Sequence, residues 1–203
     1  MDKMKIKYYR QESGLTCGIA CLRMALGSFG DEVTESELAK KIKIHSFGIY
    51  TTDLGLSALE RGYKVVIYTF HLRILAPLGP KFGTRISNEI LDKVTIQPSD
   101  RHTIESWKNY LKAGGELIWD YPKINQIRPE SVININTAAI NRFWKNWDNG
   151  HYLIIIEKNN DSVVVADPDP WSKNIYLIKN EKLIPAWSIN ARLSSGHLMT
   201  LKK

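Results

Sequence analysis

The sequence has little cysteine, no long hydrophobic run and fewer acidic than basic residues. Only two cysteines, Cys17 and Cys21, occur among 203 residues, and side chains four positions apart on a helix suit a disulfide poorly. The longest apolar stretches, such as YLIIIE, have the length of a strand and not of a membrane span. These absences argue against a disulfide-stapled secreted protein and against a membrane protein. We expect a cytoplasmic chain with reduced thiols and no membrane segment.

Basic residues outnumber acidic ones by 28 to 21, which gives a net charge of +7. Much of the excess lies in residues 171–203, where six basic side chains stand against the single acid Glu181. These charges do not gather on one helix face, and the sequence contains no glycine-rich phosphate loop and no zinc-finger spacing. A basic surface is therefore favoured over a nucleic-acid partner.

Helical patterns dominate the first part of the chain. We expect helices over residues 17–29, in TESELAKKI with a Thr34–Glu37 capping box, in TTDLGLSALERG up to Gly62, and in ESWKNYLKAGG. Prolines and glycines in LAPLGPKFG predict a loop or lid over residues 71–100. Residues 136–147 are interpreted as a short helix or a loop packed by Trp144 and Trp147.

Strand patterns dominate the second part. Short segments rich in β-branched and aromatic residues predict strands in YKVVIYT, GELIWDYP, HYLIIIEK, DSVVVADP and NIYLIK. Helices followed by an antiparallel sheet indicate the α+β class. With 43% hydrophobic residues, the chain can bury one core, so we predict a single domain over residues 1–203.

The helix that begins near residue 17 is apolar nearly all round and starts with a cysteine. The positive end of a helix dipole favours a thiolate, which makes Cys17 a candidate nucleophile. Cys21 lies one turn deeper and lacks this advantage, so we interpret it as packing. Gln11 precedes Cys17 by six residues across the tight loop SGLTCG. Its amide can reach back and, with the Cys17 N–H, donate to an oxyanion.

A cysteine nucleophile needs a histidine base and a third group that orients the ring. Among five histidines, His151 opens the strand HYLIIIEK beside Gly150, and Asp167 ends the next strand. A short hairpin makes these strands antiparallel neighbours, which predicts that His151 and Asp167 lie nearly cross-strand. A zinc site built from Cys17, Cys21 and His151 is disfavoured because the usual close pair of cysteine ligands is absent. We expect no metal and no cofactor.

The segments RQESGLTCGIACLRMAL and GHYLIIIEKNNDSVVVADP resemble papain-like cysteine peptidases of the double-glycine-leader (bacteriocin-processing) type, and more closely their stand-alone bacterial relatives. The resemblance covers about half of the chain and leaves residues 71–147 unmatched. It implies a papain-like fold in which the nucleophile, at a helix N-terminus, packs on a C-terminal antiparallel sheet. It also implies that Gln11 forms the oxyanion hole, Cys17 attacks, His151 is general base and acid, and Asp167 orients the histidine.

Two features depart from that pattern. Ile19 stands where relatives often have proline, and no transporter or ATPase segment accompanies the domain, so export-coupled leader removal is not implied. We predict a cysteine peptidase that cleaves a peptide or peptide-like substrate through a thioester. An acyltransferase or transpeptidase with the same chemistry, a catalytically silent peptide-binding module and a nucleic-acid binder remain alternatives. The substrate and the oligomeric state do not follow from the sequence.

Tryptophans flank the predicted site in the sequence. Trp171 follows ADPDP, and Trp144 and Trp147 precede His151. Each is a candidate wall that shields the cysteine and the histidine, although packing in the core or at its rim is the commoner role of tryptophan.

Overall fold

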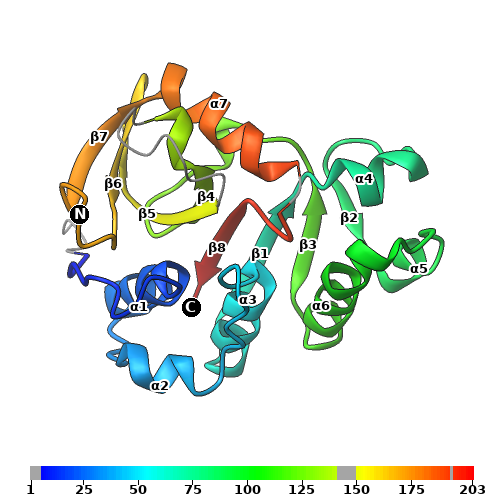
Figure 1. Ribbon diagram of the computed structural model, residues 1–203, viewed down its shortest axis with the longest axis horizontal. Helices are drawn as coiled ribbons and strands as arrows, with labels where there is room; N and C mark the ends of the chain where they lie inside the picture. Colours follow the sequence, from blue (N-terminus) through cyan, green and yellow to red (C-terminus); the bar gives the residue numbers. More distant parts are fainter. Residues whose placement is uncertain (1–5, 141–149, 193) are drawn as a thin grey trace.

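A computed structural model of the protein describes residues 6–140, 150–192 and 194–203. Figure 1 shows the elements, coloured along the sequence. The helices are α1 (Cys17–Ser28), α2 (Glu35–Ala39), α3 (Thr51–Glu60), α4 (Leu72–Leu75), α5 (Asn88–Leu91), α6 (Arg101–Lys112) and α7 (Asn180–Ala191), with short 3₁₀ turns at Ala76–Leu78, Pro98–Asp100, Ile124–Gln126 and Thr137–Ala139. The strands are β1 (Lys64–Thr69), β2 (Thr84–Ile86), β3 (Glu116–Trp119), β4 (Val132–Asn136), β5 (Gly150–Lys158), β6 (Ser162–Ala166), β7 (Ile175–Lys179) and β8 (Leu198–Lys202).

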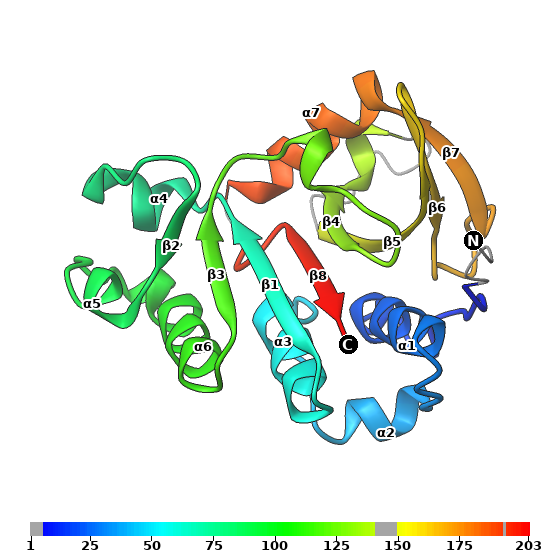
Figure 2. The same cartoon turned by 180° about the vertical axis from the view of Figure 1, so that it is seen from behind.

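All eight strands belong to one sheet, in the order β2-β3-β1-β8-β4-β5-β6-β7. The α+β fold class predicted from the sequence is thus confirmed. One detail of that prediction is wrong, because β1 and β3 pair in parallel while their other neighbours are antiparallel. Parallel neighbours need a long crossover, and the segment from α4 to α6 supplies it. Figure 2 shows β4 to β7 as a strongly curved part beside β1, β3 and β8.

Two apolar cores lie on the two faces of this sheet. Helices α1, α3 and α6 cover one face (Figures 1 and 2), where Leu22 and Trp107 are fully buried. Helix α7 covers the other face of the curved part, where Trp187 is fully buried. Strand β5 contributes Tyr152 to the first core and Leu153 to the second. A strand buried on both faces has a continuous apolar sequence, which explains the run in HYLIIIEK.

The boundaries of α1 and α3 agree closely with the sequence prediction, whereas α6 begins at Arg101, four residues before the predicted segment ESWKNYLKAGG. The Thr34–Glu37 capping box is present, since the Thr34 hydroxyl accepts from the Glu37 N–H at 3.2 Å and the Glu37 carboxylate accepts from the Thr34 N–H at 2.8 Å. Gly62 follows α3 with φ +86°, a left-handed conformation that glycine adopts at little cost. No helix within the described ranges is both long and apolar enough to cross a membrane.

The interpretation of residues 71–100 as a loop or lid is wrong. This segment contains α4, β2 and α5, and Leu75, Ile86 and Leu91 are buried in the first core. Its elements are only three or four residues long, so none shows a clear period in the sequence. The strand β4, with the sequence VININ, was also missed, as were α7 and β8. Trp144 and Trp147 lie outside the described residues.

Candidate active site

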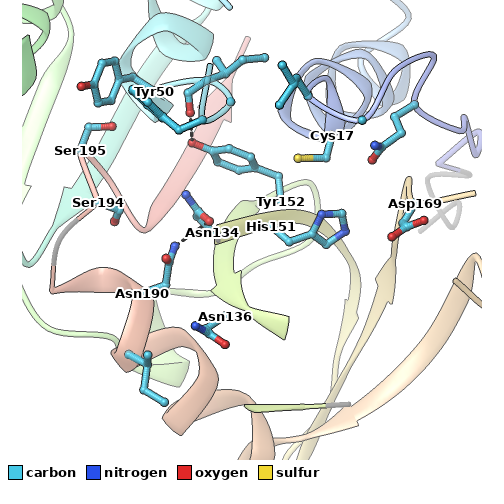
Figure 3. A pocket seen from close by; sticks show the side chains of 18 of the residues that line it. Cys17, Tyr50, Asn134, Asn136, His151, Tyr152, Asp169, Asn190, Ser194 and Ser195 are labelled. Atoms are coloured by element: carbon cyan, nitrogen blue, oxygen red, sulfur yellow. Dashed lines mark hydrogen bonds between the residues drawn. The ribbon is translucent and has the colours of Figure 1, made fainter. Parts of the chain in front are cut away.

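A cavity of about 490 Å³ opens at the N-terminal end of α1 (Figure 3), beside β4, the start of β5 and the end of α7. Its walls combine polar side chains with apolar ones. The polar lining includes Gln11, Cys17, Asn134, His151 and Asn190, and the apolar lining includes Leu15, Phe47, Tyr50 and Ile189. Three of the predicted site residues therefore line one cavity.

Helix α1 begins at Cys17, which is half-buried, whereas Cys21 is fully buried. Thr16 occupies the N-cap position but makes no side-chain cap, because its hydroxyl donates to the Ser13 carbonyl at 3.0 Å. The first turn carries no acidic residue. The backbone N–H groups at this helix end are therefore left to stabilise negative charge on the Cys17 sulfur.

Close packing of α1 on β5 brings Cys17 near His151. A Cβ atom added at Gly18 would lie only 3.0 Å from side-chain atoms of Leu54 and Tyr152, so glycine at this position favours the close approach. Cys21 faces the interior, where burial is the largest cause that raises the pKa of its thiol well above the ordinary value. Two cysteines one turn apart thus have different environments, one at an opening and one in the core.

His151 is buried, with 8% of its surface exposed. Its Nε2 lies 2.7 Å from Oδ1 of Asp167. The Cys17 thiol lies close enough to the ring to raise the pKa of His151. Figure 3 shows Cys17 and His151 next to each other at the cavity. This is the order of contacts that a nucleophile, a base and an orienting acid require.

The predicted cross-strand placement of His151 and Asp167 needs correction. His151 is the cross-strand partner of Ile135 on β4. On the other side, β6 ends at Ala166 opposite Ile154, and a bulge shifts the register between Ile155 and Glu157. Asp167 thus lies just beyond the end of β6, and its side chain reaches back to the imidazole.

Asp167 is 5% exposed, and three hydrogen bonds hold its carboxylate. Besides the contact to His151, Oδ1 accepts from the Asp169 N–H at 3.0 Å, and Oδ2 accepts from the Tyr176 hydroxyl at 2.8 Å. Tyr176 was not identified from the sequence, where NIYLIK gives only the signal of an ordinary strand. These three hydrogen bonds hold the Asp167 carboxylate in a fixed orientation.

The two partners of His151 control its protonation. Burial of the ring opposes the charged form, but the hydrogen bonds to Asp167 and Cys17, and the negative charges of these two groups, outweigh burial and raise the pKa of His151 to about 10. The imidazolium is therefore the stable form at neutral pH. It forms an ion pair with the Asp167 carboxylate.

Gln11 lies in a loop that is anchored at two points. Its backbone N–H donates to the Pro168 carbonyl at 2.9 Å, and the next N–H, of Glu12, donates to the Glu35 carboxylate at 2.9 Å. Its side-chain amide donates one hydrogen to the Ser13 carbonyl at 2.8 Å, which leaves the second hydrogen. Glu35 lies on α2 and is only 1% exposed. Its anchoring role was missed, because the acidic residues of this segment were interpreted only as part of the helix N-terminus.

The walls of the cavity differ from those considered in the sequence. Trp171 is 85% exposed and is not among the lining residues. The apolar wall is formed instead by Phe47 and Tyr50, whose rings pack edge-to-face at 5.3 Å, and by Ile189 of α7. Across the cavity, the Asn190 amide donates to Oδ1 of Asn134 at 2.7 Å.

These features define a cysteine-peptidase type of site on a papain-like α+β fold, and the comparison with protein families agrees. The sequence model of the Peptidase_C39 like family matches residues 3–195. The chain therefore belongs to the Peptidase_C39 like family, and it is an enzyme of the cysteine-peptidase type. No match was found among the curated proteins.

Solved structures share the fold over nearly the whole chain. The peptidase domain of Streptococcus ComA, a bi-functional ABC transporter of a quorum-sensing pathway, is 12% identical with a TM-score of 0.54, covering 97% of this chain and 98% of that chain. A double glycine motif protease from an AMS/PCAT transporter, in complex with the leader peptide, is 14% identical with a TM-score of 0.52 and coverages of 98% and 93%. A C39-like peptidase from Bacillus anthracis is 17% identical with a TM-score of 0.54 and coverages of 98% and 96%.

Proposed function

We propose that the protein cleaves a peptide or amide bond through a Cys17 thioester, with His151 as acid and base, Asp167 as the orienting anion and Gln11 as an oxyanion donor. One observation carries the proposal: the buried His151 ring contacts Asp167 and lies beside Cys17 (Figure 3), at the wall of a cavity large enough for several residues of a peptide. This arrangement suits acyl transfer to sulfur.

In the proposed reaction, the Cys17 sulfur attacks the carbonyl carbon of the substrate and forms a C–S bond. The carbonyl oxygen becomes an oxyanion that accepts from the Cys17 N–H and from the second hydrogen of the Gln11 amide. The imidazolium of His151 gives its proton to the leaving amine as the C–N bond breaks, and a thioester remains. Water then attacks the thioester, His151 takes a proton from it, and the Cys17 sulfur is released.

The test begins with the thiol and needs no substrate. Iodoacetamide alkylation of Cys17, followed by mass spectrometry, is compared in the wild type and in His151→Ala across pH. We expect selective labelling of Cys17 near neutral pH in the wild type and a loss of at least about tenfold in the variant, because the imidazolium no longer stabilises the thiolate. The exposed His102 provides the matched control, and His102→Ala should react like the wild type. Labelling that ignores His151 would contradict the ion pair and favour a silent peptide-binding module.

A second measurement assigns the reaction. One solved neighbour is a double glycine motif protease in complex with a leader peptide, so a peptide with two consecutive glycines is the first probe. Mass spectrometry follows the acyl group on Cys17 and its release with and without an added amine. Release to water alone supports the peptidase, whereas release that requires the amine assigns an acyltransferase. Cytoplasmic location and the single domain over residues 1–203 stay predictions.

A further inference from the structure

Tyr176 contacts the orienting acid from the side opposite the histidine. It lies on β7, the last strand of the sheet, as the cross-strand partner of Val165 on β6. Its hydroxyl donates to Oδ2 of Asp167 at 2.8 Å, while His151 contacts Oδ1 at 2.7 Å. On the basis of the proposed function, we propose that Tyr176 is a positioning residue that keeps the Asp167 carboxylate ionised and directed at His151.

The chemistry of the hydroxyl fixes the direction of this hydrogen bond. Burial, together with the charges of Asp167 and Asp169, raises the pKa of Tyr176 well above the ordinary value. The phenol therefore keeps its hydrogen and donates it, since a carboxylate has none to give. A hydrogen bond to the charged form of an acid favours that form. Without the hydroxyl, Oδ2 has no other donor among the residues that the structure describes.

Several titratable groups face Asp167, and their positions separate the role of Tyr176 from theirs. They are His151 on β5, Cys21 on α1, Asp169 in the loop after β6, Tyr176 on β7, and Tyr8 in the N-terminal segment. Tyr8 is the informative comparison. Its hydroxyl also contacts Asp167, at 2.9 Å, but it donates to the backbone carbonyl and not to the carboxylate.

The test is the pH dependence of Cys17 alkylation in Tyr176→Phe, with Tyr8→Phe as the matched control. Each variant removes one hydroxyl that contacts Asp167 and keeps the ring. In Tyr176→Phe the carboxylate loses the donor at Oδ2 and is held less firmly against the imidazolium, so the pKa of His151 falls. We expect the alkaline midpoint of the profile, where His151 loses its proton, to move down by about one pH unit, the size of one hydrogen bond to a charged group. In Tyr8→Phe the midpoint should not move.

A double variant tests whether Tyr176 acts through Asp167. In an Asp167→Asn background, Tyr176→Phe should change the alkylation rate no further, because the anion is already absent. Cys21 reports folding in the same experiment, since it is fully buried and becomes labelled only when the protein opens. If Cys21 becomes labelled in Tyr176→Phe, the variant Tyr176→His is used in place of Tyr176→Phe. Its ring N–H can donate to Asp167, so we expect the midpoint of the wild type.

The outcomes are distinct. The role of Tyr176 would be overturned if the midpoint does not move in folded Tyr176→Phe, or if it moves equally in Tyr8→Phe. It would also be overturned if Tyr176→Phe lowers the alkylation rate further in the Asp167→Asn background, or if Tyr176→His displaces the midpoint by about one pH unit. Each of these results leaves the proposed function intact as long as wild-type Cys17 is labelled selectively. If it is not, the proposed function fails and the role of Tyr176 fails with it.

Discussion

Two buried histidines, at the starts of two strands in one sheet, have pKa values shifted in opposite directions. His197 precedes β8 and is fully buried, its Nε2 lies 3.0 Å from the Asp120 carbonyl, and burial lowers its pKa to about 4. His151 near the start of β5 is almost as buried, yet its pKa is raised to about 10. The contact with a neutral carbonyl leaves an imidazole neutral, whereas a carboxylate and a thiol keep the other one charged. The difference in pKa between His151 and His197 therefore comes from the groups that each ring contacts and not from the depth of burial.

The sequence around these histidines is almost the same. Both follow a glycine and introduce an apolar strand, in GHYL and GHLM. A third histidine, His71, is also buried, packs edge-on against Trp107 and has a pKa lowered to about 4 by burial. Neutrality is thus the ordinary state of a histidine buried in this protein. His151, with its raised pKa, is the exception among these three buried histidines.

The largest expected effect comes from removing the anion that distinguishes His151. In Asp167→Asn, the pKa of His151 should fall toward that of His197, and peptide turnover should fall by about 10³- to 10⁴-fold. Alkylation rates and turnover at neutral pH measure this effect. Asp169→Asn is the matched control, because Asp169 contacts Asp167 through its backbone N–H, which the change preserves. Equal losses in both variants would refute a specific role for the Asp167 carboxylate.

The second effect is the pH dependence of the free energy of unfolding, to which His197 contributes as a buried base that is neutral in the folded protein. Because the folded pKa of His197 is about 4 and the ordinary value is 6.5, the unfolded chain binds more protons between these values. The free energy of unfolding should therefore fall as pH drops from 6.5 to 4, by about 3 kcal/mol for a single such histidine. For His151 the sign is opposite: its contribution is full below pH 6.5 and is lost as pH rises to about 10.

Urea unfolding at several pH values checks this sign. His197→Gln keeps an amide donor and removes one titrating group, so the slope of the unfolding free energy against pH should become shallower between pH 4 and 6.5. His102→Gln, at an exposed position, should leave the slope unchanged. A slope in His197→Gln equal to that of the wild type would show that His197 is not neutral in the folded protein.

The third prediction separates the ion pair from the stabilisation of the oxyanion. Gln11→Ala should lower peptide turnover by about 10²-fold, since one oxyanion donor is lost. The pH profile of Cys17 alkylation should stay unchanged, because no oxyanion forms when iodoacetamide reacts. Glu12→Gln serves as control, as Glu12 uses its backbone N–H to contact Glu35. A shifted alkylation profile in Gln11→Ala would place Gln11 in the ion pair and not in the oxyanion hole.

The smallest effect on stability is expected at His45, which has a carboxylate nearby but no hydrogen bond to it. Its Nε2 lies 3.6 Å from the Asp53 carboxylate, beyond hydrogen-bond distance, and its ring stacks on Phe47 at 5.1 Å. His45→Gln should change the free energy of unfolding by less than about 1 kcal/mol. Thermal unfolding measures it beside His102→Gln. A larger loss would mean that the His45–Asp53 pair is as strongly coupled as the pair at His151.

The catalytic candidates could be predicted from the sequence because each follows a local rule. Cys17 begins an apolar helix, and His151 and Asp167 lie at the ends of strands joined by a short hairpin. Tyr176 and Glu35 could not be found in this way, because their roles depend on which side chain a distant segment brings near. The same limit applies to His197, which only the fold distinguishes from His151.

The fold was predicted where long, strongly apolar segments carry a clear signal, as in α1 and β5. It was missed where elements are short or carry mixed signals. Strand β4 alternates apolar residues with Asn134 and Asn136, and all of its residues are buried. Helix α7 contains Pro185 and has no side-chain N-cap among the described residues. Both elements are fixed by packing against the curved part of the sheet and not by local preference.

The charge state of His151 is the central claim, and NMR titration of the histidine rings tests it most directly. Isotope-labelled wild-type protein is titrated, and His151 is assigned by its loss in His151→Gln. We expect the His151 ring to stay protonated up to about pH 10, and His197 and His71 to stay neutral down to about pH 4. A His151 ring that loses its proton at or below the ordinary value of 6.5 would contradict the account.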